Sequence, residues 1–336
     1  MKHTMMKKVV AGIMSVALIA GLATGCSNGQ TATSEDAVTV GVIQYATHPS
    51  LDNCYEGFKQ GLEEAGFVEG ENLVLDFQNG QNDAGTVDMA AKNMVSKQED
   101  MVVGIATPAA MSAYAAAKDT DIPVVFTAVN DPVASQIVQS LETPGTNCTG
   151  TSDVLPLEDQ IKMIRAFLPD ADTIGILYTN SESNSISNLE KFEELAPQYG
   201  FKVEAMGVTS ANEVASGAQA LVAKGVDCIN NFTDNNVVDN LSSVLQAANE
   251  AGIPVFGSEI EQVKNGCLAS MSIDYVALGR QTGQMAAQIL KGEANASDMA
   301  VQQITESSPV YNSQVMQTLG LSLPADYSNA EDQAKA

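Results

Sequence analysis

The stretch MVVGIATPAA (101–110) decides the fold that we expect, because it joins a buried strand directly to the start of a helix. MVVGIA has no polar side chain, which is typical of a parallel strand covered on both faces. Thr107 follows as a helix N-cap, and Pro108 occupies the first helical position, where its missing amide is not needed. A junction of this kind indicates an α/β fold with parallel strands.

The same strand-to-helix junction recurs along the chain. FTAV (126–129) runs into Asn130-Asp131-Pro132, CINNF (228–232) into Thr233-Asp234-Asn235, and MSI (271–273) into Asp274. In parallel sheets these strand ends share one edge, and ligands bind there beside helix N-termini. We therefore expect a ligand cleft lined by these junctions.

Strand-length apolar runs alternate with amphipathic helical patterns such as Leu51–Gly66. The runs fall into two sets of similar layout: VTVGVIQY (38–45), LVLDF (73–77), MVVGIA and PVVFTAV (123–129), then TIGILYT (173–179), KVEAMGV (202–208), DCINNF (227–232), PVFGS (254–258) and LASMSI (268–273). This layout predicts two doubly wound α/β lobes instead of one sheet of about ten strands. The segment Asn147–Asp153 is the expected first crossing between the lobes.

The N-terminus has the pattern of a secretory signal. Lys2, Lys7 and Lys8 precede the uncharged apolar stretch Val9–Ala23, which at 15 residues is short for a spanning helix of roughly 20. Small residues then lead into Cys26, where a lipid would be attached; the alternative is an ordinary cysteine just past a cleavage site. We expect a signal peptide over 1–25 and a lipidated Cys26 with a polar tether over 26–37.

The acidic composition limits the partners. Loss of the three signal lysines would leave 13 basic and 41 acidic residues, a net charge of −28. Such a chain repels nucleic acid and anionic lipid head groups, so contact with a membrane is expected only through the lipid anchor. Cys54, Cys148, Cys228 and Cys267 match no zinc spacing and are expected to be free buried thiols, although three pairings remain open.

Catalytic and cofactor motifs are absent from the sequence. His48 is the single histidine after the signal, and the chain has no G-x-S-x-G elbow, GxGxxG, Walker A loop or EF-hand. We therefore expect a binding protein that is not an enzyme and holds neither metal nor cofactor.

A zwitterion is the ligand class that the strand ends favour. Arg165 and Arg280 are the only arginines and both lie in helical patterns, so a carboxylate would instead meet the Thr107 hydroxyl and the amides of Ala109 and Ala110. The alternative is that Thr107-Pro108 merely starts a helix. An ammonium group would meet Asp153, Asp234 or Asp274, each of which could otherwise only cap a helix. Tyr45, Phe126, Phe232 and Phe256 could line the cleft or pack in the core.

Motifs in sequential order resemble a known family. They are HPSLD (48–52), VVGIATPAA (102–110), NDPVAS (130–135), TGTSD (149–153), IGILYTNSESNS (174–185), TDNN (233–236) and DYVALGRQTGQMAAQILKG (274–292). Together they are similar to the tryptophan/tyrosine-type substrate-binding lipoproteins of ABC transporters, over Val38 to Leu323. The chain departs from that pattern at Asn130, where Thr is commoner, and at Asn231, where an apolar residue or Pro is common. Both departures bear on which ligand is bound and not on the class of protein.

The resemblance implies a type I periplasmic-binding-protein fold: two Rossmann-like lobes joined by three crossings, with an aromatic amino acid, tryptophan first, between them. Thr107 and Ala109 would then meet the carboxylate and Asp153, Asp234 or Asp274 the amine, with Ser50, Glu182, Asn184 and Asn235 nearby. The expected lobes are 38–150 plus 271–297 and 151–270 plus 298–325, followed by a polar tail over 326–336.

The resemblance also implies an extracytoplasmic monomer that delivers its ligand to an ABC permease and ATPase. Two alternatives remain open. One is a sensory lipoprotein that reports a ligand to a signalling partner. The other is a sugar receptor of the same fold, which the absence of Trp makes less favoured.

Overall fold

The computed structural model describes residues 37–304 and 306–334. The predicted signal peptide, Cys26 and all of the tether before Ala37 lie outside the described residues. Over the part of the chain that is described, no helix is long and apolar enough to cross a membrane.

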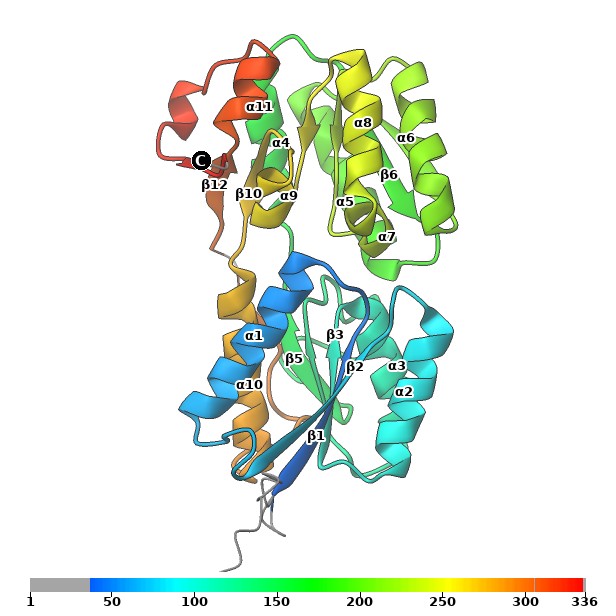
Figure 1. The fold of residues 1–336 in the computed structure, drawn as a ribbon, viewed down its shortest axis with the longest axis vertical. Helices are drawn as coiled ribbons and strands as arrows, with labels where there is room; N and C mark the ends of the chain where they lie inside the picture. Colours follow the sequence, from blue (N-terminus) through cyan, green and yellow to red (C-terminus); the bar gives the residue numbers. More distant parts are fainter. Residues whose placement is uncertain (1–36, 305, 335–336) are drawn as a thin grey trace, which may run out of the picture. The chain divides into compact units, whose positions relative to one another are not determined.

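The first lobe is built on a six-stranded parallel sheet with the order β11-β5-β4-β3-β1-β2 (Figure 1). Its strands are β1 (Val38–Gln44), β2 (Leu73–Asn79), β3 (Met101–Ile105), β4 (Val124–Thr127), β5 (Cys148–Ser152) and β11 (Gln302–Gln303). Helices α2 (Ala84–Ser96) and α3 (Thr107–Ala117) pack together on one face of the sheet, and α1 (Pro49–Glu64) and α10 (Tyr275–Leu290) pack together on the other.

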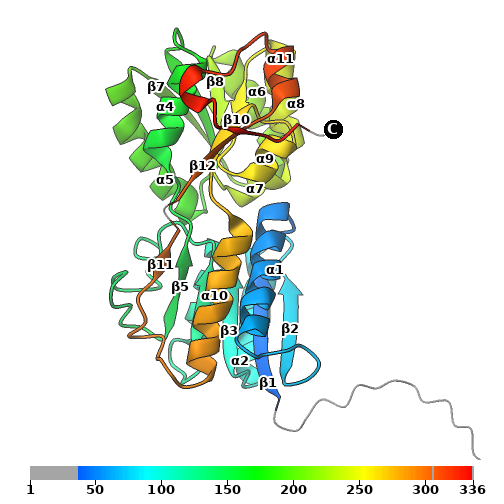
Figure 2. The ribbon, with the colours of Figure 1, turned by 90° about the vertical axis from the view of Figure 1, so that its left-hand side faces the viewer.

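Glycines let α1 and α10 approach closely, although the two helices lie more than 200 residues apart in sequence (Figure 2). A Cβ atom on Gly57 would lie 2.1 Å from the Val276 carbonyl oxygen, and one on Gly279 would lie 2.0 Å from that of Cys54. Both distances are far inside van der Waals contact, so any side chain at these positions would push the helices apart.

The second lobe contains two smaller sheets. The four-stranded parallel sheet has the order β7-β6-β8-β9, and in the three-stranded sheet β12 pairs antiparallel with β10 and parallel with β13. The strands are β6 (Thr173–Thr179), β7 (Lys202–Val208), β8 (Cys228–Asn230), β9 (Val255–Phe256), β10 (Ala269–Ser272), β12 (Ser308–Tyr311) and β13 (Glu331–Asp332). The helices are α4 (Leu157–Phe167), α5 (Ser183–Leu195), α6 (Val214–Ala223), α7 (Asn235–Asp239), α8 (Leu241–Ala251), α9 (Ile260–Lys264) and α11 (Ser313–Thr318), with short 3-10 turns at Ala196–Tyr199, Ala211–Glu213 and Ala325–Tyr327.

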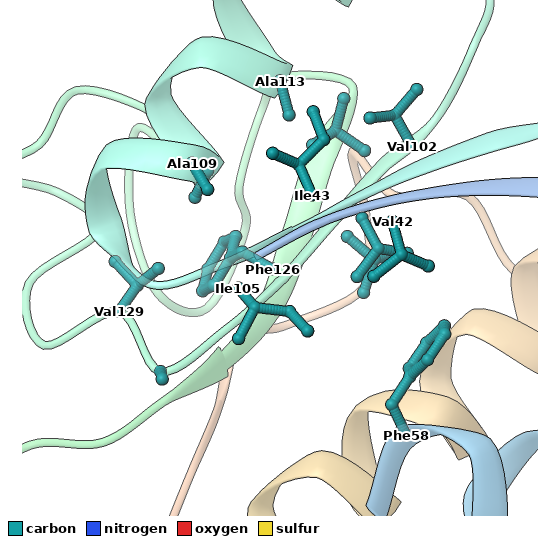
Figure 3. Packing of buried hydrophobic residues seen from close by; sticks show 14 of the residues in the cluster. Val42, Ile43, Phe58, Val102, Ile105, Ala109, Ala113, Phe126 and Val129 are labelled. Atoms are coloured by element: carbon teal, nitrogen blue, oxygen red, sulfur yellow. The ribbon is translucent and has the colours of Figure 1, made fainter. Parts of the chain in front are cut away.

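Each lobe has its own hydrophobic core, as the apolar runs predict. In the first lobe, Val42 and Ile43 leave β1 on opposite sides, Val42 towards Phe58 and Ile43 towards Ala113 (Figure 3). In the second lobe, one cluster packs beneath α4 and α5 and another beneath α6 and α8. The strands are therefore covered on both faces, which confirms the α/β prediction. Cys54, Cys148, Cys228 and Cys267 are buried and free, also as expected.

The chain crosses between the lobes three times: after β5, between β10 and α10, and between β11 and β12. The structure corrects the predicted boundaries at each crossing. Thr151 and Ser152 complete β5 in the first lobe, Met271 and Ser272 belong to β10 in the second, and β11 pairs with β5 in the first. The pairing of β11 rests on backbone hydrogen bonds, which a two-residue polar strand does not reveal in the sequence.

The predicted polar tail is partly built into the second lobe. Glu331 and Asp332 form β13 beside β12, and the Tyr327 ring stacks on Phe167 with a centroid distance of 6.5 Å. Backbone pairing and this one aromatic contact therefore anchor a segment whose composition is otherwise polar.

Candidate functional site

A cavity lies between the carboxyl ends of the strands of the two lobes and holds about 340 Å³ free of protein atoms, part of it open to solvent. The first lobe contributes residues that follow β1, β3, β4 and β5, and the second contributes residues that follow β6, β8 and β9. The lining residues are His48, Ser50, Leu51, Ala106, Thr107, Ala128, Asn130, Asp153, Asn184, Thr233, Asn235, Val238, Glu259 and Tyr275. This is the position that the strand-end argument predicts for a ligand.

Two strand ends adopt strained backbone conformations at this cavity. Ala106 after β3 has a φ of 77°, and Ala128 after β4 has a φ of 55°, values that favour glycine. Both residues line the cavity. Non-glycine residues at positive φ persist where the surrounding structure holds them, and they concentrate at functional sites.

The N-terminus of α3 opens onto the cavity through Thr107, which is buried. The Ala110 amide donates to the Ala106 carbonyl oxygen at 3.0 Å, so it forms the first bond of the helix. This corrects the expectation that the Ala110 amide is free for a carboxylate. The Thr107 and Ala109 amides come before that first bond, so the helix itself offers them no carbonyl acceptor. Pro108 has no amide. Ala109 is buried and does not line the cavity with its side chain.

Of the three aspartates predicted to bind the amine of the ligand, Asp153 is the one that lines the cavity. Its Oδ2 accepts a hydrogen bond from the Tyr275 hydroxyl at 2.8 Å. Its Oδ1 is buried and has no hydrogen-bond partner among the described residues. Burial raises the pKa of Asp153 to about 7, because the charged carboxylate is removed from water. A buried carboxylate oxygen without a partner is a site for a donor that a ligand would bring.

The other two predicted aspartates lie elsewhere and have structural roles. Asp234 is buried behind the cavity, where it accepts hydrogen bonds from Thr179 N (2.6 Å), Thr179 Oγ1 (2.8 Å), Ser185 Oγ (2.7 Å) and Val237 N (3.0 Å). Asp274 is exposed and caps α10 by accepting from Val276 N (2.9 Å) and Ala277 N (3.0 Å). Neither lines the cavity, because helix capping and strand-end bonds turn both carboxylates away.

Glu182, Asn184 and Asn235 form a buried polar group on the second lobe. Glu182 Oε2 accepts from Asn235 N (3.1 Å) and Nδ2 (2.7 Å) and from Asn184 Nδ2 (3.3 Å). Asn184 and Asn235 line the cavity, whereas Glu182 lies behind them. Within the described chain, Glu182 Oε1 and Asn184 Oδ1 have no hydrogen-bond partner. Burial, and then the charge of Asp234, raise the pKa of Glu182 to about 8.

Of the two candidates near the end of β1, Ser50 lines the cavity and Tyr45 does not. The Tyr45 hydroxyl donates to the Asn82 carbonyl oxygen at 3.4 Å, away from the cavity. Burial, with smaller contributions from Glu182 and other acids, raises the pKa of Tyr45 to about 12. Phe126, Phe232 and Phe256 are fully buried and pack in the lobe cores.

Sequence reasoning left several lining residues outside the predicted site. His48 is buried, and burial lowers its pKa to about 4, so the imidazole is neutral. Glu259 caps α9 by accepting from Gln262 N at 2.8 Å and Glu261 N at 2.5 Å, and burial raises its pKa to about 7. His48, Asn130 and Glu259 all follow strand ends, so the strand-end rule could have identified them. Tyr275 also follows a strand end, as the first residue of α10 after β10, but its bond to Asp153 joins residues 122 positions apart and is not visible in the sequence.

The charge distribution suits a zwitterion. Of the residues that the structure describes, no lysine or arginine lines the cavity. Arg165 donates to the carbonyl oxygens of Tyr199 (2.9 Å) and Ala171 (2.7 Å), and Arg280 pairs with Glu64 at 2.7 Å. A positive group is provided instead by the N-terminus of α3, and acceptors are provided by Asp153, Asn184 and Glu259. The arrangement can bind a small molecule that carries both an amine and a carboxylate.

Comparisons with known proteins give a family and a curated relative. A family described as ABC transporter substrate binding protein matches residues 39–335. A tyrosine-binding protein of Clostridioides difficile (strain R20291) is 35% identical over 341 residues, covering 98% of this chain and 96% of that protein.

Solved structures of similar sequence also include proteins of this kind. An ABC domain from Streptococcus pneumonia in complex with L-Trp is 36% identical, covers 88% of this chain and 98% of its own, and superposes with a TM-score of 0.84. A ligand-free, open substrate binding protein with adhesive properties from Clostridium difficile is 39% identical, covers 89% and 100%, and has a TM-score of 0.68. A Bacillus halodurans solute binding protein with bound myo-inositol, at 15% identity and a TM-score of 0.61, shares the fold.

Proposed function

Because the chain belongs to the ABC transporter substrate-binding protein family, we propose that it captures an aromatic amino acid, tryptophan first and tyrosine or phenylalanine next. The observation that carries the proposal is that one cavity contains both a buried Asp153 Oδ1 without a hydrogen-bond partner and the N-terminus of α3. Among the described residues, no cationic side chain lines this cavity. The tyrosine-binding name and the L-Trp complex of its relatives support an aromatic side chain.

The amine of the ligand binds Asp153. An ammonium group satisfies Oδ1, while the Tyr275 hydroxyl continues to hold Oδ2 at 2.8 Å. The positive ligand lowers the pKa of Asp153 from its raised value of about 7, so the bound carboxylate is ionised. Buried charges are stable when they are paired and hydrogen-bonded in this way.

The carboxylate of the ligand binds the first turn of α3. The Thr107 and Ala109 amides belong to the positive end of the helix, which attracts anions, and the Thr107 hydroxyl is a further donor there. Leu51, Ala106, Ala128 and Val238 supply apolar lining for a side chain, and Asn184 and Asn235 face it from the second lobe. A ligand that touches both lobes favours a closed arrangement through a hinge motion at the crossings.

Substrate-binding proteins of ABC importers act outside the cytoplasm and deliver their ligand without transforming it. For this chain we propose delivery to an ABC permease with its ATPase, attachment to the membrane through lipidated Cys26, and action as a monomer. The signal pattern before Cys26 supports the anchor.

Calorimetry with matched analogues tests the ligand. L-Tryptophan should bind one per chain, whereas indole propionate, which lacks the amine, and tryptamine, which lacks the carboxylate, should bind much more weakly. Each analogue leaves one set of buried polar groups unpaired. Leucine is the control for the aromatic side chain. Tighter binding of leucine or of a pentose than of tryptophan would contradict the proposed ligand.

A further inference from the structure

Three polar side chains that line the ligand cavity are not used by the amine or the carboxylate of the proposed ligand. His48 and Ser50 follow β1 at the start of α1, and Glu259 follows β9. Burial raises the pKa of Glu259 to about 7, and the Ser50 hydroxyl, which lies beside that carboxyl, acts against the rise. We call these three residues the α1 polar group.

Two members of the α1 polar group are buried with an unsatisfied polar atom. His48 is 7% exposed and Ser50 is 2% exposed. Within the described chain, His48 Nδ1 and Ser50 Oγ complete no hydrogen bond. Helix capping does not account for the imidazole, because His48 is the N-cap of α1 and makes no side-chain cap bond. A buried polar atom without a partner is unfavourable, so both atoms suit a site where a bound molecule completes their hydrogen bonds.

The strand order of the first lobe places the α1 polar group beside the sites proposed for the amine and the carboxylate. Asp153 follows β5 and Thr107 follows β3, and the order β5-β4-β3-β1 puts the end of β1 next to that of β3. Neighbouring strands lie about 4.8 Å apart, which an aromatic side chain extending past β3 can span. Leu51 and Val238 line the same cavity and offer apolar contacts to the ring.

The chemistry of the α1 polar group favours a hydrogen-bond donor on the ligand. Burial lowers the pKa of His48 to about 4, so the imidazole is neutral and accepts through one ring nitrogen. The Ser50 hydroxyl can also accept. Glu259 adds carboxylate oxygens, and no lysine or arginine of the described residues lines the cavity, so an anionic ligand atom would be repelled here.

We propose that the α1 polar group binds the hydrogen-bond donor on the ring of the ligand, the N–H of an indole or the O–H of a phenol, and so selects tryptophan and tyrosine over phenylalanine. The inference rests on the proposed function, which sets the positions of the amine and the carboxylate. An apolar pocket discriminates weakly between rings that differ by one polar atom, whereas buried hydrogen-bonding groups reject an analogue that leaves them unpaired. His48 and Ser50 are then specificity-determining residues.

Calorimetry with matched ligands tests the ring contact. L-Benzothienylalanine keeps the amine, the carboxylate and the shape of tryptophan, but sulfur replaces the indole N–H. It should bind at least about tenfold more weakly than tryptophan, and phenylalanine at least about tenfold more weakly than tyrosine. A difference below twofold in either pair would overturn the inference and leave the proposed function intact. If no aromatic amino acid binds, the proposed function fails and the inference fails with it.

A double variant tests whether His48 and Ser50 make the contact. His48→Leu with Ser50→Ala should weaken tryptophan binding at least about tenfold and leave the Kd of benzothienylalanine within twofold of the parent, which also shows that the variant is folded. Thr233→Val is the matched control: it removes a lining hydroxyl that already donates to Asn130 Oδ1 at 3.3 Å, so the ratio of the two Kd values should stay at that of the parent. A parental ratio in the double variant would overturn the assignment, because His48 and Ser50 would then act on both ligands alike.

Discussion

Replacing Asp153 by Asn should greatly weaken tryptophan binding while the protein stays folded. Asp153 is 2% exposed, so solvent screens its charge little, and its Oδ1 has no partner within the described structure. Loss of one partner of a buried charged pair costs about 2–5 kcal/mol, which corresponds to an increase in Kd of about 30-fold to 5,000-fold. The carboxamide oxygen can still accept from the Tyr275 hydroxyl, which limits the cost to folding.

The assay is calorimetry at about pH 8, where a carboxyl group with a pKa of about 7 is mostly ionised. Asp274→Asn is the matched control, because Asp274 is exposed and asparagine caps helices as well as aspartate does. Indole propionate sharpens the comparison: it has no amine, so its affinity should not fall in Asp153→Asn. Binding of tryptophan within twofold of the parent, or an equal loss in Asp274→Asn, would refute the assignment of the amine site.

Three further outcomes are expected. Because burial raises the pKa of Asp153 to about 7 and a bound ammonium lowers it, binding releases a proton below that pH, and the tryptophan Kd should rise by up to about tenfold per unit as pH falls below 7; titration calorimetry should show a shallower slope in Asp153→Asn. Cys26→Ala should leave the protein soluble or with an uncut signal, and detergent partitioning that is identical for a cleaved variant and the parent would rule out the anchor. Gly279→Ala should destabilise the first lobe by about 1–3 kcal/mol, since its Cβ would lie 2.0 Å from the Cys54 carbonyl oxygen. Gly85→Ala in α2 is the control, because the nearest atom to its Cβ is Asp83 Oδ1 at 3.4 Å; denaturant unfolding of Gly279→Ala that matches this control would contradict the steric argument.

Local pattern was sufficient for the architecture and for the edge of the sheets where the cavity lies. Strands such as MVVGIA are apolar on both faces because helices cover both sides of the sheet, and this property is visible in consecutive residues. Thr107-Pro108 marked a helix start for the same local reason, but the predicted cap was wrong by one residue: Ala106 is the N-cap, and Thr107 is the first residue of α3 and makes no side-chain cap bond. Thr107 does line the cavity. Ser50, Asp153, Asn184 and Asn235 also follow strand ends, and they line it as well.

Only the tertiary structure decided which carboxylate faces the cavity. Asp153, Asp234 and Asp274 are similarly placed in the sequence, since each comes within a few residues of a strand end and could cap a helix or meet a ligand. They differ in their partners: four donors surround Asp234, the amides of α10 hold Asp274, and Tyr275 leaves one oxygen of Asp153 free. The pairing of β11 with β5 depends likewise on contacts between residues far apart in the chain. Periodicity reports the environment of neighbouring residues, whereas a hydrogen bond between distant segments exists only once the chain has folded.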